Sequence, residues 1–335
     1  MFRLFTRCIV ATALLLPAIA VAEPITLKLS FFTSDRTVAY QTAIKPFVDA
    51  INREGKNLLH VQVYPSGTLG KEQKQLPQLV LSGGADIAFI IPGQNPERFR
   101  DTDVIALPGL FRDAREATLV YTRLVAAGAL SGYDDFFVIG AYGTAPETIH
   151  SRKRLTSLSD LREQKIRVNN SMEAAGLTKL GARPEVLAFN QTSPAISGGT
   201  IDGATVPSAQ LYDVGIGQLT SNHYLLPTST APLTLMMNRK VFDALPENAK
   251  ALIRKYSGEW AADQFIAVYD KINSEVLERI KADSRRSVAS PTAADFKTAQ
   301  AAFSSIRNSW AAESPHNGEL LMQADAEIAK LRQTK

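Results

Sequence analysis

The chain has 335 residues, of which 45% are hydrophobic and 21% are charged. These values are typical of a folded globular protein that has about two domains and a sizeable core. The 37 basic and 33 acidic residues leave a net charge of +4. Because basic residues do not cluster with aromatic ones, the sequence indicates no nucleic-acid partner.

The first 22 residues are typical of a secretory signal peptide. Arg3 and Arg7 precede the apolar run CIVATALLLPAIAVA, and Ala20-Val21-Ala22 offers a small-residue cleavage site. The alternative, a membrane anchor, is disfavoured because the apolar run is too short for a spanning helix. We therefore expect a periplasmic mature protein that starts near Glu23 and has no cysteine, since Cys8 lies in the signal.

Strands and helices alternate in the first part of the mature chain. Apolar alternation and short apolar runs predict strands at residues 25–32, 59–65, 85–91 and 136–143. Apolar residues at helical spacing predict helices at residues 38–52, 71–81 and 113–127, with Asp113 as the N-cap of the last. This order is typical of an α/β fold with mostly parallel sheets.

The stretch from residue 161 to 207 is the centre of the chain. It predicts a strand at 165–168, helices at 170–180 and 191–197, and a strand at 200–205. A strand at 233–239, a long helix at 251–280 that could break at Gly258, and helices at 293–310 and 320–331 follow. Because no low-complexity linker divides the chain, we expect two interwoven lobes joined by crossing strands.

Arg167 is the strongest candidate for a functional residue. It lies in the apolar strand KIRV, just before a helix N-terminus that Asn170 can cap and Glu173 can close as a capping box. A guanidinium fork beside free N–H groups suits a carboxylate. The structural alternative is an ion pair with a neighbouring acid, because a buried arginine is costly unless paired.

The sequence offers little support for an enzyme or a metal site. His60, His150, His223 and His316 are far apart, and none has metal-ligand spacing with another His or Cys. The nucleophile elbow, the phosphate loop and the dinucleotide fingerprint are also missing from the sequence. We therefore expect no cofactor and no catalytic residue, although triads need no proximity in sequence.

Several segments together resemble the substrate-binding proteins of tripartite ATP-independent periplasmic (TRAP) transporters. The resemblance covers nearly all of the mature chain. It lies in VQVYPSGTLGKEQ, LVLSGGADIAF, LPGLFRD, SLSDLREQKIRV, TKLGARPEVLAFNQ, GGTIDGA and LMMNRKVFDALPENAKALI, which keep the order and spacing of the family.

The resemblance implies a two-lobed, type II-like periplasmic binding protein with crossing strands and a long helix that spans both lobes. The expected divisions are a signal peptide (1–22), the first part of lobe I (23–144), lobe II (145–230), and a return strand, spanning helix and C-terminal helices (231–335). The implied partners are a small carboxylate ligand and TRAP membrane subunits, with no nucleic acid and a monomeric protein.

The resemblance also implies roles for residues of the ligand site. Arg167 matches the family arginine that pairs with the ligand carboxylate, and Phe189 matches the residue that flanks the ligand; by itself Phe189 reads as a core aromatic. Val206 occupies a position often held by Asn, and Glu147 lies in the segment Ala145-Pro146-Glu147, where some members have a second arginine. Further wall residues, expected from their positions at strand ends, are Asn169, Thr144, Gln94 and Thr33.

These departures from the family pattern favour a monocarboxylate with an apolar body over a sugar acid or dicarboxylate, and the segments PGQNPERF and IDGATVP are similar to a branch of the family associated with aromatic acids. The alternatives are the binding protein of an ATP-driven importer, an exported enzyme acting on an acid, and a receptor for a membrane sensor.

Overall fold

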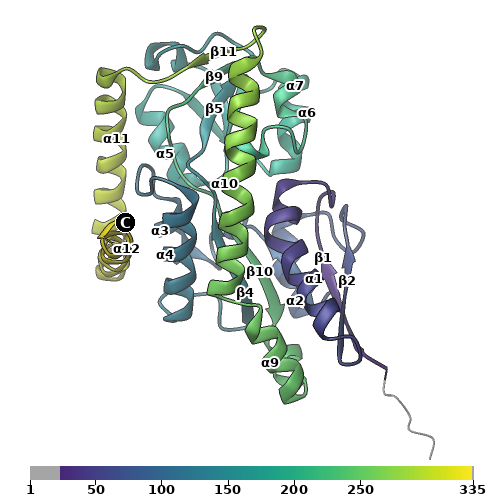
Figure 1. The fold of residues 1–335 in the computed structure, drawn as a ribbon. Helices are drawn as coiled ribbons and strands as arrows, with labels where there is room; N and C mark the ends of the chain where they lie inside the picture. Colours follow the sequence, from purple (N-terminus) through teal and green to yellow (C-terminus); the bar gives the residue numbers. More distant parts are fainter. Residues whose placement is uncertain (1–22, 334–335) are drawn as a thin grey trace, which may run out of the picture.

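The computed structural model describes residues 23–333, so the expected signal peptide lies outside the described residues. Two separate sheets organise the fold, one of five strands and one of six. We call the first sheet with the helices that cover it the first lobe, and the second sheet with its helices the second lobe (Figure 1).

The first sheet has the strand order β2-β1-β3-β10-β4. Strand β10 runs antiparallel to both of its neighbours, whereas β1 is parallel to β2 and β3. The expectation of mostly parallel pairing was therefore incomplete, because β10 re-enters this sheet from the other lobe. The strands are β1 (Ile25–Ser30), β2 (Leu59–Tyr64), β3 (Ile87–Ile90), β4 (Phe136–Gly143) and β10 (Pro232–Asn238).

The second sheet has the order β11-β9-β5-β8-β6-β7, and here β5 is antiparallel to both neighbours. Strand β6, which carries Arg167, lies between β8 and β7. The strands are β5 (Thr148–Ser151), β6 (Lys165–Val168), β7 (Arg183–Val186), β8 (Gly203–Val206), β9 (Asn222–Tyr224) and β11 (Ser287–Ala289).

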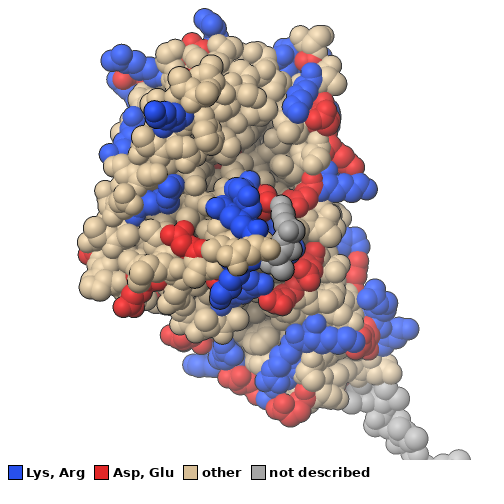
Figure 2. All heavy atoms as spheres, turned by 60° about the vertical axis from the view of Figure 1, so that its left-hand side comes forward, with Lys and Arg blue, Asp and Glu red and all other residues tan. Residues whose placement is uncertain are grey.

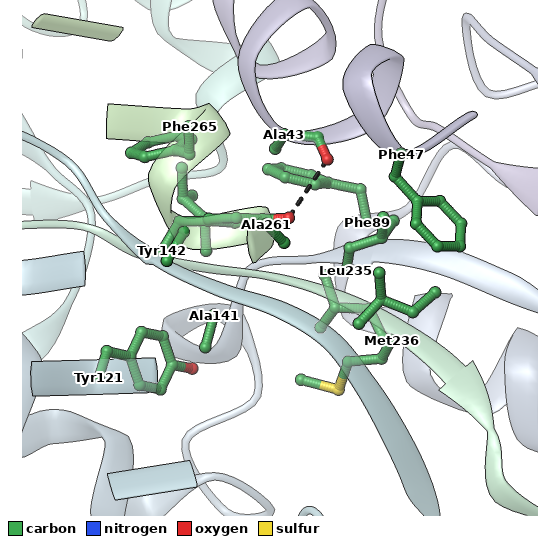
Figure 3. Packing of buried hydrophobic residues seen from close by; sticks show 14 of the residues in the cluster. Ala43, Phe47, Phe89, Tyr121, Ala141, Tyr142, Leu235, Met236, Ala261 and Phe265 are labelled. Carbon is green, nitrogen blue, oxygen red and sulfur yellow. Dashed lines mark hydrogen bonds between the residues drawn. The ribbon is translucent and has the colours of Figure 1, made fainter. Parts of the chain in front are cut away.

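Apolar side chains bury both faces of the first sheet. Phe47, Phe89 and Leu235 meet on one face beside Tyr142, whose hydroxyl donates to the carbonyl of Ala43 at 3.3 Å (Figure 3). Ring stacking continues from Tyr142 to Phe265, at a centroid distance of 4.8 Å. The helices of this lobe are α1 (Lys45–Glu54), α2 (Leu76–Leu81), α3 (Asp103–Ala106), α4 (Ala114–Ala126), α8 (Arg239–Ala244) and α9 (Glu247–Lys255).

The second lobe has smaller helices and two smaller apolar clusters. Its helices are α5 (Ser171–Lys179), α6 (Thr192–Ser197) and α7 (Ile216–Leu219). Short helical turns complete the fold: η1 (Tyr40–Ile44), η2 (Gln73–Gln75), η3 (Pro92–Gln94), η4 (Arg100–Thr102), η5 (Leu158–Leu161), η6 (Phe189–Gln191) and η7 (Ser208–Gln210).

The long helix α10 (Glu259–Ala282) runs along both lobes (Figure 1). It packs against α4 and β4 of the first lobe and against η7 and β11 of the second. The expected break at Gly258 is confirmed, since this glycine has φ +63° between α9 and α10. Helix α11 (Ala293–Ala312) then packs on α5, and α12 (Pro315–Gln333) packs on α3 and α4.

Two chain segments cross between the sheets side by side, one from β4 to β5 and one from β9 to β10. The amide N–H of Glu147 donates to the carbonyl of Ser229 at 2.7 Å, and that of Thr228 donates to the carbonyl of Glu147 at 2.9 Å. Thr144 Oγ1 accepts the amide N–H of Ala231 at 2.9 Å. These bonds couple the two crossing segments, where any relative movement of the lobes must bend the chain.

Candidate ligand site between the lobes

Arg167 is completely buried in β6. Its Nε donates to the Leu187 carbonyl at 2.9 Å and its Nη1 to the Thr205 carbonyl at 3.4 Å. Its Nη2 donates to Asn169 Oδ1 at 2.6 Å. A guanidinium has five N–H groups, so Nη1 and Nη2 each keep one N–H after these bonds. Among residues 23–333 no carboxylate forms a direct salt bridge with it, although the buried carboxyl groups of Glu147 and Glu173 act on its charge from farther away.

The helix after β6 begins as the sequence predicts. Asn170 caps α5, and its Oδ1 accepts the amide N–H of Glu173 at 2.9 Å. The Glu173 carboxylate differs from the expected capping box, because Oε2 accepts the N–H of Asn169 at 3.2 Å rather than that of Asn170. Glu173 Oε1 accepts the Thr228 hydroxyl at 2.7 Å, which ties α5 to a crossing segment.

A narrow cavity lies between the lobes next to this helix. Its free volume is ≈ 20 Å³, which suits about one water molecule. Both lobes contribute to its wall, so the structure is in a closed form. The lining residues are Phe32, Thr33, Thr37, Ala39, Phe89, Ile91, Asn169, Phe189, Gln210, Asp213, Ala231 and Leu233.

The wall combines aromatic rings with a polar end. Phe32, Phe89 and Phe189 contribute rings, and the Arg167 guanidinium carbon lies 5.8 Å from the Phe189 ring centroid. Such a cation–aromatic contact is stabilising when it is shielded from water. The cavity therefore has apolar walls and a cation behind Asn169, an arrangement that suits an anion with an apolar body.

Polar contacts close the cavity across the two lobes. The amide N–H of Val38, in the first lobe, donates to Asp213 Oδ1 at 3.1 Å and Oδ2 at 3.0 Å. Gln94 Nε2 donates to the backbone carbonyl of Asn169 at 3.3 Å. Burial raises the pKa of Asp213 to about 7, although the hydrogen bond from Val38 opposes the rise.

Comparison with known proteins identifies the family. The model of bacterial extracellular solute-binding protein family 7, named DctP, matches residues 29–313. The chain belongs to the solute-binding proteins of TRAP transporters. A curated relative, the C4-dicarboxylate-binding periplasmic protein DctP of Rhodobacter capsulatus, is 24% identical over 283 residues, covering 81% of this chain and 82% of the relative.

Solved structures share the two-lobed fold of this TRAP solute-binding protein. One from Rhodoferax ferrireducens, in complex with copurified benzoate, has a TM-score of 0.85 at 24% identity and covers 92% of this chain and 99% of its own. A marine metagenome TRAP solute-binding protein specific for aromatic acid ligands has a TM-score of 0.84 at 23% identity, covering 91% and 99%. The predicted fold class is thereby confirmed.

The structure brings part of the expected site together. Asn169, Phe189 and Thr33 line the cavity, and Arg167 bonds directly to Asn169. The remaining three residues do not line the cavity, although Gln94 bonds to the backbone of the lining residue Asn169. The side chain of Val206 points from β8 toward the helices of the second lobe and packs in an apolar cluster there. Thr144 bonds to Ala231 on the crossing segments. Gln94 lines a neighbouring hollow.

Sequence reasoning missed several residues of the cavity in this TRAP solute-binding protein. Phe32 and Phe89 read as strand residues of the first core, and nothing local distinguishes them from other core aromatics. Gln210 ends the short turn η7 after β8, and Asp213 follows it in a loop. The only usable signal was position, since they come shortly after the carboxyl end of a strand, as ligand residues of open α/β sheets do.

Other features add little to the site of the TRAP solute-binding protein. A larger hollow of ≈ 680 Å³ lies between α11, α12 and the segment 109–112, away from the cavity. On the face shown in Figure 2, basic and acidic side chains are interspersed. Within residues 23–333 no helix is long and apolar enough to cross a membrane, and no group of three or more His, Cys, Asp or Glu could hold a metal ion.

Proposed function

We propose that this TRAP solute-binding protein captures a small organic monocarboxylate with an apolar, preferably aromatic, body. It then delivers this ligand to the membrane subunits of its transporter. The observation that carries the proposal is the fully buried Arg167, which keeps two N–H groups and has no ion-pair partner in the described chain. A buried cation without a direct salt bridge is costly, and a ligand carboxylate would bind the two N–H groups that remain.

The character of the cavity supports an apolar monocarboxylate. Three phenylalanine rings contribute to its wall, and Asp213 stands at the polar end. A second carboxylate on the ligand would find no second arginine among the lining residues and would lie near Asp213, whose ionised form would repel it. The structural neighbours that bind benzoate and other aromatic acids agree with this class.

The other parts of the proposal concern location and activity. Residues 1–22 act as a cleaved signal peptide, so the protein works in the periplasm. It is a monomer, and its lobes divide near residues 144 and 231. It binds no nucleic acid and converts no substrate. Product analysis by mass spectrometry after incubation with the bound acid tests the enzyme alternative, since any turnover would support it.

A thermal-shift screen tests the ligand class directly. A ligand that binds only the folded protein raises Tm, by an amount equivalent to about 2.7 kcal/mol at a hundredfold excess over Kd. Benzoate and 3-hydroxybenzoate are expected to raise Tm, whereas succinate and galacturonate have little effect. Benzamide is the matched control because it keeps the ring and lacks the carboxylate. Equal shifts from benzamide and benzoate would reject the proposal.

Closure of the lobes is expected to depend on pH through Asp213. Its pKa rises from an ordinary value of 3.8 to about 7 in the closed form, so closing takes up a proton. The closed form is therefore most favoured at pH values below the ordinary pKa and loses this advantage as the pH rises through about 7. Asp213→Asn, which mimics the protonated acid and keeps an acceptor for the Val38 N–H, should remain closed throughout.

Small-angle scattering of the ligand-free protein measures this closure as a decrease in the radius of gyration. Asp35→Asn is the control, because it changes an exposed acid between the lining residues Thr33 and Thr37. A radius that is independent of pH in the wild type, or a pH response that persists in Asp213→Asn, would contradict the prediction.

A further inference from the structure

Glu147 is a buried acid that the proposed capture of a carboxylate does not by itself explain. Its side chain lies on the crossing segment between β4 and β5, and only 1% of the residue is exposed. Oε1 accepts a hydrogen bond from Asn169 Nδ2 at 2.8 Å. Oε2 is buried and has no hydrogen-bond partner among the described residues. One carboxyl oxygen is thus satisfied and the other is not.

Asn169 connects Glu147 to Arg167. Its Oδ1 accepts from Arg167 Nη2 at 2.6 Å, while its Nδ2 donates to Glu147. An amide that bonds to a donor on one side and an acceptor on the other has a fixed orientation. Without the carbonyl-type acceptor at Glu147, the amide could turn its NH₂ group toward the guanidinium, where two donors would face each other. Glu147 therefore fixes the orientation of the Asn169 amide, and this amide in turn fixes the position of the Arg167 guanidinium.

The charges around Glu147 come from three elements. Arg167 on β6 is a cation, Glu173 on α5 is a second carboxyl group, and Tyr269 on α10 is a buried phenol. Two hydroxyl groups, of Thr205 and Thr228, complete the surroundings. If both glutamates were ionised, two negative charges would share one cation before any ligand arrived. A ligand carboxylate would then enter a site with excess negative charge.

The two glutamates are not equivalent as holders of the negative charge. Glu173 lies in the first turn of α5, where the helix dipole favours an anion, and it accepts bonds from Thr228 and from the Asn169 amide N–H. Among the described residues the Glu147 carboxyl group accepts one side-chain hydrogen bond within normal geometry, from the Asn169 amide. Burial raises the pKa of Glu147 well above its usual value, and Glu173 raises it further, whereas Arg167 and Thr205 act in the opposite direction.

We propose that Glu147 is a positioning residue that stays a neutral carboxylic acid and, through the Asn169 amide, holds Arg167 ready for the ligand carboxylate. The inference rests on the proposed function, because it assumes that an acid binds at Arg167. Its consequence is that ligand binding and ionisation of Glu147 oppose each other. Affinity therefore falls once the pH is high enough to ionise Glu147, by about tenfold per pH unit beyond that point.

Calorimetry with benzoate between about pH 6 and about pH 10 tests this role in the wild type, Glu147→Gln and Glu147→Ala. Glutamine copies the neutral acid, with a carbonyl for Asn169 and no titration. It should bind within about threefold of the wild type at pH 6 and keep its affinity at higher pH, where the wild type weakens. Alanine removes the acceptor and should weaken binding about tenfold or more throughout. Circular dichroism confirms that each variant is folded.

Two comparisons make the outcome decisive. Asp213 titrates in all three proteins, so only the difference between the wild-type and Glu147→Gln profiles reports on Glu147. Identical profiles, or an alanine variant that binds like the wild type, would overturn the inference while leaving carboxylate capture intact. If no acid of the screen binds the wild type, the proposed function fails instead. Infrared spectroscopy of the ligand-free protein then still decides, since the carboxylic-acid carbonyl band at neutral pH must be stronger in the wild type than in Glu147→Gln.

Discussion

Arg167→Ala is expected to weaken binding of the ligand carboxylate by about 2–4 kcal/mol, a loss of roughly 30-fold to 1,000-fold in Kd. The variant removes the cation that contacts Asn169 and Phe189, and with it the two N–H groups left for the ligand. Isothermal titration with benzoate, or with whichever acid gives the largest thermal shift, measures the loss. An unchanged Kd would show that the anion binds elsewhere.

Arg167→Lys separates the loss of charge from the loss of the guanidinium fork. An ammonium keeps the positive charge but cannot offer two parallel N–H groups, so only partial recovery of affinity is expected. Both variants also leave the carbonyls of Leu187 and Thr205 without their donor, so unfolding must be measured beside binding. Arg285→Ala, at an exposed arginine of the second lobe, is the control for a change in net charge.

Glu116→Gln is expected to lower the free energy of unfolding by about 2–3 kcal/mol. Glu116 is buried in α4 and binds two arginines. It accepts from Arg332 Nε at 2.8 Å and Nη2 at 2.9 Å, which anchors α12, and from Arg112 Nε at 2.7 Å. Glutamine cannot satisfy both guanidinium groups. Chemical denaturation measures the loss, and hydrogen exchange should show it mainly in α12. Glu319→Gln, at an exposed acid of α12, is the control.

The same carboxylate predicts a loss of stability in acid. Burial raises the pKa of Glu116, but the hydrogen bonds from Arg332 and Arg112 outweigh this effect and lower it to about 2. Because the pKa is below its ordinary value of 4.5, the contribution is fully present above that pH and is lost as the pH falls toward 2. Denaturation curves of wild type and Glu116→Gln should converge in this range; a constant difference would contradict the assignment.

Local signals in the sequence predicted most elements of the first lobe. Asp113 caps α4 with its side chain, as expected, and the apolar runs mark β1, β2, β3 and β4. The second lobe was harder, because β5, β7, β9 and β11 have only three or four residues. Strand β7 is the partly exposed sequence RPEV at the sheet edge, so it has no apolar alternation to detect. Such strands exist because of partners distant in sequence.

In the candidate site, too, some residues are placed by local sequence and others by contacts that are distant in sequence. Arg167, Asn169 and Asn170 lie within four consecutive positions, so a strand followed by a helix cap already placed them together. Phe89 and Asp213 come from different lobes and meet only when the lobes close, which no local pattern encodes. Glu147 reads as an ordinary surface acid after a proline, and its burial follows from the pairing of the crossing segments.

The narrowness of the cavity has a consequence for kinetics. Because the free space between the lobes is only ≈ 20 Å³, an aromatic acid must enter and leave through a state in which the lobes lie farther apart. The residence time of the bound ligand should then depend on how often the two lobes separate. Ligands that differ in affinity would share an upper limit to their dissociation rate, visible as a plateau in stopped-flow chase experiments.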